Sequence, residues 1–215
     1  MLSTTERTTQ RKSNRALTGR EDLYAVLDAG MICHLGVIHD ASGDAFPMVV
    51  PTGYGRIGDT LYLHGSSAAR SLRAGGEGQI CVTVTHLDGV VLARSAFHHS
   101  LNYRSAMIYG TPRLVTDEAE RMEGLRALTE NLAPGQWDTV RKPNRKEMAA
   151  TIVLALSLEE ASVKVRTGPP EDDAADHALP VWAGVLPVRQ VFDAPVTDPA
   201  LRHDLPVPDH ITHRI

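Results

Sequence analysis

The segment RSAFHHSLNYRS, residues 94–105, gathers an unusual number of hydrogen-bonding side chains. It holds two adjacent histidines, an asparagine, a tyrosine, two arginines and three serines within twelve residues. Stretches that look like ordinary strands lie on either side of it. A metal site, a nucleophilic relay or a flat polar cofactor would each need such groups, and a polar surface loop without a site would also carry them.

The histidine spacing argues against a metal. His98 and His99 would point to opposite faces of a strand, so they cannot easily bind one ion together. The ten histidines show no His-x-x-x-His spacing, and Cys33 and Cys81 do not form a Cys-x-x-Cys pair. A Gly-x-Ser-x-Gly nucleophile turn is also missing. We therefore expect no metal, and the sequence gives little support to hydrolase chemistry.

A second candidate site follows the apolar run TLYLHG, residues 60–65, with the segment SSAARSLRAGGEG. We expect a strand that runs into a short helix ended by Gly75 and Gly76. Two hydroxyls, the free amides of a first helical turn and a guanidinium could together bind a phosphate, and Ser66, Ser67 and Arg70 would supply the side chains. A capped surface helix with a solvated arginine would show the same pattern. No Gly-x-Gly-x-x-Gly motif follows an expected strand, which argues against a Rossmann-type dinucleotide site.

Composition limits the class of protein. The 215 residues include 42% hydrophobic residues and carry a net charge of −4, from 22 basic and 26 acidic side chains. These values are ordinary for a globular protein and give no basic surface for nucleic acid or membrane binding. The N-terminus has no apolar signal region and no run is long enough to span a membrane, so we expect a cytoplasmic protein with two reduced core thiols.

The hydrophobic patterns predict a mainly β protein with helices, an α+β class built as an antiparallel barrel. A flexible arm covers residues 1–16, a main domain residues 17–167 and an extended segment, packed on the barrel or on a partner, residues 168–215. The first helix should be capped by Thr18 and stopped by Gly30, and a longer helix should cover residues 116–132. Turns are expected at Ile57–Thr60 and at Leu87–Gly89. The expected strands cover residues 31–38, 46–57, 60–65, 79–86, 89–97, 103–115 and 151–165.

Several of these segments, taken in order, resemble one protein family. TLYLHGSSAARSLRAGG followed by RSAFHHSLNYRSAMIYGTPRLV is similar to the FMN-binding split barrels, most of all to the pyridoxamine 5′-phosphate oxidase-related branch that contains nitroimidazole-resistance proteins. The segments VVPTGYG, PGQWDTVRKPNRKEMAATIVLAL and WAGVLP extend the resemblance over roughly residues 12–190.

The resemblance implies a six-stranded antiparallel split barrel that forms a homodimer, with FMN at the subunit interface. It places the FMN phosphate at Ser66, Ser67 and Arg70, and the flavin ring beside Val50, Pro51 and Thr52. It also brings a group of side chains from the opening segment near the flavin, namely Ser100, Asn102, Tyr103 and Ser105. His64 would lie at the mouth of the pocket as a cofactor or substrate contact, and His98, His64 and Tyr103 are the candidate proton-transfer residues.

The C-terminus departs from the true pyridoxamine phosphate oxidases. Those enzymes carry a Glu-aromatic-Trp segment followed by Arg-x-His, whereas here Trp182 has no preceding Glu and Arg202 directly precedes His203. We therefore predict an FMN-dependent oxidoreductase that passes electrons from a nicotinamide to a small nitroaromatic or quinone acceptor. A non-catalytic flavin store or redox sensor, a haem-binding split barrel and a deazaflavin protein are the alternatives.

Overall fold

The computed structural model describes residues 1–10, 13–41 and 43–214. The ten strands are β1 Ala16–Leu17, β2 Ile32–Ala41, β3 Asp44–Ile57, β4 Thr60–Ser66, β5 Ile80–Leu92, β6 Ser100–Gly110, β7 Arg113–Leu114, β8 Thr151–Ser157, β9 Ala161–Arg166 and β10 Gly184–Pro187. The α-helices are α1 Arg20–Asp28, α2 Arg70–Glu77, α3 Glu118–Leu132, α4 Gln136–Thr139, α5 Arg145–Ala149 and α6 Asp209–Thr212. Short 3-10 helices cover η1 Ser13–Arg15, η2 Ala96–His98 and η3 Ala174–Ala178.

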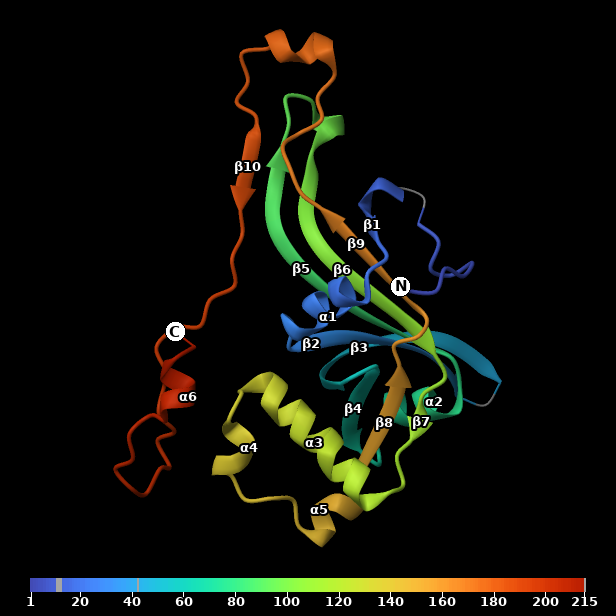
Figure 1. Cartoon of the computed structure of the whole chain (residues 1–215), viewed down its shortest axis with the longest axis vertical. Helices are drawn as coiled ribbons and strands as arrows, with labels where there is room; N and C mark the ends of the chain where they lie inside the picture. The colour runs from blue at the N-terminus through green and yellow to red at the C-terminus, as the bar shows by residue number, and fades with distance from the viewer. Residues whose placement is uncertain (11–12, 42, 215) are drawn as a thin grey trace.

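The strands form an antiparallel split barrel with flanking helices, as predicted (Figure 1). Their order is β1-β9-β6-β5-β2-β3-β4-β8-β7, and β10 pairs with β5. The described strands number ten rather than six, because three short strands add to the edges and the run 151–165 divides into β8 and β9. Residues 158–160 connect β8 to β9, so a tight turn joins the two halves of the sheet.

Helix α1 closes one end of the barrel. Leu23, Val26 and Leu27 are buried in the main core, as the apolar spacing predicted. The predicted Thr18 cap is wrong: Gly19 occupies the N-cap without a side-chain cap, since Thr18 still belongs to the extended chain and its carbonyl accepts the N–H of Leu2. Glu21 and Asp22 in the first turn instead complement the helix dipole.

The Leu87–Gly89 segment is a bulge within one long strand, not the predicted turn. β5 runs from Ile80 to Leu92 and shifts register against β6 between Leu87 and Gly89. A Cβ on Gly89 would lie 3.0 Å from Val185 and 3.2 Å from the carbonyl of Leu186, so glycine lets β10 approach the bulge. The hairpin turn therefore comes later, and His98 and His99 lie in it rather than adjacent on a strand.

Helix α2 also differs from the prediction, because Gly75 and Gly76 lie inside it. A Cβ on Gly75 would already touch Val37 and Ile80 at 3.4 Å, and one on Gly76 would lie 3.5 Å from Leu154. These are ordinary van der Waals distances, so the packing of α2 on the sheet does not by itself require glycine at either position. The two glycines do not end the helix, which continues to Glu77.

Helix α3 is confirmed over Glu118–Leu132, with Asp117 as its cap. It packs on β3 at Gly55, where a Cβ would come within 2.5 Å of the α3 backbone at Ala127 and Leu128. The leucines of α3 are only partly buried: Leu128 is in the core, whereas Leu132 is 52% exposed.

The two ends of the chain lie on the outside of the barrel. In the arm, Leu2 is buried and Arg7 pairs with Glu160. The segment after Arg166 climbs to the tip of the β5–β6 hairpin, turns at η3 and descends through β10 to α6 (Figure 1). No helix within the described parts of the chain is long and apolar enough to cross a membrane.

Candidate functional site

The predicted phosphate site lies where β4 runs into α2. Ser66 is the last residue of β4, and its hydroxyl accepts the N–H of Ala68 at 3.1 Å. Ser67 and Arg70 are both exposed, and Arg70 begins the helix. The serines thus precede the helix in a turn instead of forming its first residues. Since the N-cap Ala69 offers no side-chain oxygen, the amides of the first turn are left for an external acceptor.

His64 and the β3 strand flank this turn. His64 is exposed near the end of β4, yet desolvation by its neighbours lowers its pKa below the usual 6.5. Val50, Pro51 and Thr52 pair on one side with Leu35, His34 and Cys33 of β2. On the other side the β3–β4 ladder covers only Tyr54–Ile57, so within the described chain the 50–52 edge faces no strand. Backbone groups on that edge are available to a planar polar ligand.

The opening segment divides between two faces of β6. Asn102 is buried, and its side chain bonds to the Arg166 guanidinium and to the Gly168 carbonyl. Tyr103 and Ser105 belong to the opposite face because side chains alternate along a strand. The Ser105 hydroxyl reaches only the Lys164 carbonyl, at 3.5 Å. One ligand within this chain therefore cannot contact all of the predicted residues.

The remaining candidates lie near the hairpin tip. Ser100 is half-buried where β6 begins, and His98 Nε2 lies 3.3 Å from the Asp173 carboxylate. Between β6 and β4 in the sheet order come β5, β2 and β3. The predicted ring contacts on β6 and the predicted phosphate contacts after β4 are thus on separate parts of the sheet. Their combination in one site needs a second protomer.

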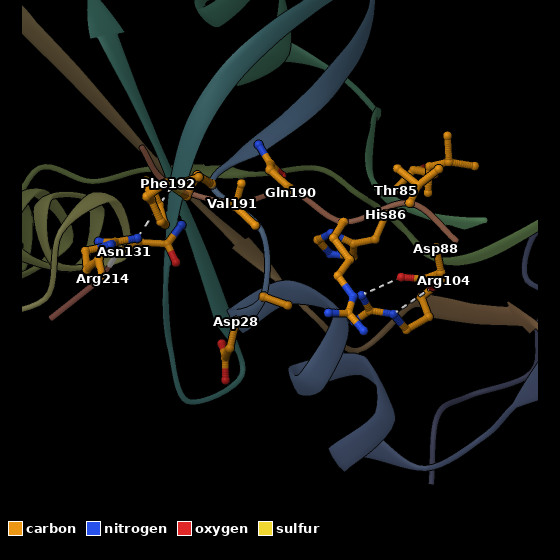
Figure 2. A pocket seen from close by; sticks show the side chains of 15 residues that line it. Asp28, Thr85, His86, Asp88, Arg104, Asn131, Gln190, Val191, Phe192 and Arg214 are labelled. Atoms are coloured by element: carbon orange, nitrogen blue, oxygen red, sulfur yellow. Dashed lines mark hydrogen bonds and ion pairs between the residues drawn. The ribbon is translucent and has the colours of Figure 1, made fainter. Parts of the chain in front are cut away.

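A cavity of about 680 Å³ lies under the C-terminal segment. Nothing in the sequence indicated this cavity. Figure 2 shows His86, Asp88 and Arg104 on one side and Asn131, Phe192 and Arg214 on the other. Arg104 binds Asp88 through two hydrogen bonds of 2.9 and 3.0 Å, and the Arg214 guanidinium lies 4.4 Å from the Phe192 ring centre. Its walls come from six separate parts of the chain, so no local motif marks it.

His86 has a fixed protonation pattern in this cavity. Its Nε2 lies 2.8 Å from the Val26 carbonyl, which can only accept a hydrogen bond. Nε2 therefore donates its N–H to this carbonyl, and Nδ1 is the ring nitrogen left for another partner. Among the described residues no group of three or more histidines, cysteines or acidic residues could hold a metal ion.

The sequence pattern also gave no indication that Arg166 would be buried. Its side chain is 4% exposed and binds Asn102, Gly168 and Pro169, yet its Nε has no partner among the described residues. Cys33 is buried and desolvation raises its pKa to about 12, whereas Cys81 is half-buried; both are free thiols.

The antiparallel split barrel with flanking helices is the fold of a known class of protein. Residues 19–165 match the model of the pyridoxamine 5′-phosphate oxidase family. The chain belongs to this family, as its sequence motifs predicted.

Two solved structures are similar over nearly the whole chain. The flavocytochrome Anf3 from Azotobacter vinelandii is 43% identical, with a TM-score of 0.90 over 98% of this chain and 97% of that chain. A FAD and haem binding protein from Mycobacterium smegmatis is 38% identical, with a TM-score of 0.86 over 93% and 97% of the two chains.

A more distant structure shares the fold alone. It is a 5-nitroimidazole antibiotic resistance protein from Bacteroides thetaiotaomicron, 20% identical, with a TM-score of 0.57 over 70% of this chain and 86% of that chain. No curated protein matches the chain.

Proposed function

We propose that the chain is a flavin-binding redox protein. The observation that carries the proposal is the similarity, over nearly all of the chain, to one protein named a flavocytochrome and another named for FAD and haem binding. The exposed turn Ser66–Arg70 adds a chemical reason, because hydroxyls, first-turn amides and a guanidinium suit the phosphate of a flavin nucleotide.

Each part of this site would have its own role. Arg70 and the two serines bind the phosphate, and the open edge of β3 at Val50–Thr52 orients the polar rim of the ring. When bound, the flavin supplies the electron and hydride chemistry. His64 stays neutral near pH 7 because its pKa is lowered, so it can accept a proton at the mouth of the site.

A homodimer would complete the site. Large apolar side chains are exposed on the two strands next to the proposed ring position, including Ile32 at 59%, Ile38 at 60% and Val49 at 65%. Phe97, at the hairpin tip, is 88% exposed. Burial of these surfaces between two protomers would bring the partner's β6 face, with its Tyr103 and Ser105 positions, toward the flavin. The electron donor would be a nicotinamide and the acceptor a small nitroaromatic or quinone.

The absorbance spectrum and the flavin affinity test this function. The purified protein should show a two-banded flavin spectrum, and denaturation should release the flavin. Arg70→Ala should weaken flavin binding about ten- to a hundredfold, the loss of a charge-assisted hydrogen bond of roughly 1.5–3 kcal/mol. Arg145→Ala, an exposed arginine at the start of α5, is the matched control. A colourless protein that neither FMN nor FAD reconstitutes would refute the proposal.

Haem is a second candidate ligand, and the C-terminal segment favours it. The family match ends at residue 165, whereas the two relatives named for a cytochrome or for haem cover 93–98% of the chain, including this segment. Val188–Phe192 and Arg214 form one wall of the 680 Å³ cavity. This volume is within the usual range for cofactor sites, and the arginines suit carboxylate groups on a flat apolar ligand.

His86 is the candidate iron ligand in this cavity. Iron-binding histidines usually donate their other ring N–H to a carbonyl or carboxylate, as Nε2 of His86 does to Val26. The purified protein should then contain haem, measured by the pyridine haemochrome spectrum. His86→Ala should lower the haem content without changing the flavin content, and His177→Ala, at an exposed histidine of η3, should change neither. Haem retained in full by His86→Ala would exclude this ligand.

A further inference from the structure

Four basic side chains lie close together where α4 is joined to α5, at one end of the molecule (Figure 1). We call residues 141–146, which hold Arg141, Lys142, Arg145 and Lys146, the basic segment. All four side chains are exposed, and the segment contains no acidic residue. Arg145 and Lys146 form no ion pair with the carboxylates that the structure describes, so their charge is available to a partner.

Contacts within the chain hold the basic segment in a fixed shape. Arg141 donates to both carboxylate oxygens of Glu147, at 2.7 and 2.9 Å, and the Lys142 ammonium lies 4.8 Å from the centre of the Trp137 ring. Asn144 and Glu147 form a capping box at the start of α5. Because the segment is already ordered, a partner that binds it has little conformational entropy to overcome.

The basic segment adjoins the proposed flavin site. Ala150 directly follows α5, and its carbonyl accepts the N–H of Ser67, in the proposed phosphate turn, at 2.9 Å. The helix rises 1.5 Å per residue, so Arg145 lies only about 8 Å along α5 from this contact. A molecule bound to the basic segment would therefore lie close to the flavin without occupying its phosphate site.

Charge is distributed unequally along the molecule. Residues 168–215 carry eight acidic and three basic side chains, a net charge of −5, so the rest of the chain contributes +1 to the total of −4. Four of these carboxylates belong to residues 171–176, beside the orange helix η3, at the opposite end of the molecule from α5 (Figure 1). An acidic protein is therefore repelled from one end and attracted to the other, which orients its approach toward the basic segment.

We infer that the basic segment docks an acidic protein that carries single electrons and reduces the flavin. The inference rests on the proposed flavin function and replaces the nicotinamide as the expected electron donor. Two reduced carrier proteins bind in succession and give one electron each, and the flavin takes up these two electrons with two protons from water to become the hydroquinone. Electron-transfer complexes have small interfaces, so a few charges around the side chain of Val140, which is 39% exposed, are sufficient for one.

Stopped-flow reduction of the flavin tests the docking. The flavin-loaded full-length protein is mixed, without oxygen, with a reduced plant-type [2Fe–2S] ferredoxin, a small acidic one-electron donor of low potential. We expect the double variant Arg145→Gln/Lys146→Gln to react about tenfold more slowly than the wild type at low salt, and each single variant to lie between them. The wild-type rate should fall as salt is added, because salt screens the attraction. Arg202→Gln, at an exposed arginine of the C-terminal segment, is the control and should stay within about twofold of the wild type.

Reduced methyl viologen is the control donor. It is a small cation, so the loss of two positive charges from the protein should not slow its reaction. A defect in the flavin site itself would slow both donors, and the affinity for the flavin should be the same in all variants. A selective loss of the ferredoxin rate therefore reports on docking.

The outcomes separate this inference from the function on which it rests. A protein that binds no flavin would overturn the proposed function, and the inference with it. Equal ferredoxin rates in the wild type and the double variant would overturn the inference alone, as would a flavin that NADH reduces and ferredoxin does not. Vesicles that contain phosphatidylserine are tested with the same variants. If their binding depends on Arg145 and Lys146 while the ferredoxin rate does not, the segment serves a membrane surface and the inference is wrong.

Discussion

Arg94 and Asp172 join the C-terminal segment to the tip of the β5–β6 hairpin. The Arg94 guanidinium donates to one carboxylate oxygen of Asp172 at 2.9 Å, and the Arg94 backbone N–H donates to the other, also at 2.9 Å. The Asp172 side chain is 1% exposed. This pair fixes the point from which the segment turns at η3 and returns along β5 to form one wall of the large cavity.

Asp172→Asn should loosen the C-terminal segment. The amide keeps one acceptor oxygen but removes the negative charge that faces a guanidinium partly shielded from water. We expect a lower melting temperature and faster proteolysis between residues 173 and 190. Asp173→Asn is the matched control, since its carboxylate is 78% exposed and faces only His98. Equal proteolysis of the two variants would show that Arg94 and Asp172 do not hold the segment.

The Asp172 carboxyl group should also make the stability of the protein depend on pH in the acid range. Burial raises the pKa of Asp172, but hydrogen bonds from the Arg94 backbone and guanidinium outweigh that effect and hold the pKa below its usual value. Its contribution to stability is therefore present above the unfolded pKa of about 3.9 and is lost as the pH falls through the lower folded pKa. The difference in melting temperature between wild type and Asp172→Asn should shrink below pH 4.

Gly55→Ala should destabilise the contact between β3 and α3. The new methyl would lie 2.5 Å from backbone atoms of Ala127 and Leu128, and a helix backbone cannot move aside as a flexible side chain can. We expect a loss of about 1–3 kcal/mol in the free energy of unfolding, measured with urea. Gly53→Ala on the same strand is the control, because its nearest contact would be 3.9 Å away. Similar losses in both variants would point to β propensity and not to close packing.

Asn102→Ala should lower the free energy of unfolding, because it removes a hydrogen-bond partner of the buried Arg166. The guanidinium would lose its Asn102 partner and keep only the carbonyls of Gly168, at 3.4 Å, and Pro169, at 3.2 Å. An unsatisfied buried polar group costs about 1–3 kcal/mol, with more for a charged one. Urea unfolding should show this loss, and Ser100→Ala, two residues earlier on β6, should change stability by less than about 0.5 kcal/mol. A loss in Asn102→Ala no larger than in this control would mean that Arg166 does not depend on the amide.

His64 should make the flavin-free protein sensitive to mild acid. Its folded pKa is lowered by desolvation, so the folded state binds fewer protons than the unfolded chain. Stability is therefore full above the unfolded pKa of about 6.5 and decreases as the pH falls through the folded value. NMR titration should give His64 a pKa below 6.5, and His64→Gln should reduce the loss of stability between pH 7 and 5. His34→Gln controls for the loss of an exposed ring, and a normal His64 titration would refute the prediction.

Local patterns in the sequence were enough to predict the fold class and most of its elements. Alternating apolar residues and turn dipeptides predicted β2, β3, β4 and the hairpin at Gly58, where a positive φ of 55° suits glycine. The 3.6-residue spacing predicted α3. The turn at Ser66, Ser67 and Arg70 could be predicted as a phosphate site for the same reason, because these residues lie within five positions of the chain, and its ligand stays a prediction.

Glycines whose role is long-range could not be interpreted this way. Gly89 looks like a turn signal in the sequence, yet it allows the close approach of β10, a segment far away in the chain. Gly75 and Gly76 look like a stop signal, yet they lie inside α2. A glycine that gives conformational freedom and one that only gives space cannot be told apart in the sequence, and only the packing of β10 on the bulge shows the role of Gly89.

The candidate sites also divide into features that the sequence could predict and features that it could not. The sequence determined the family, the barrel and the residues of the turn Ser66–Arg70, where we propose a phosphate site, because these depend on neighbours within a few positions. The tertiary structure decided that the Asn102 side chain is hydrogen-bonded to Arg166. It also decided that Arg70 lines a cavity with Arg73 and Asp40, and that the C-terminal segment forms a wall of the cavity that contains His86. These contacts join residues that are 30 to more than 100 positions apart. The spacing of residue types along the chain does not indicate which distant segments will come into contact.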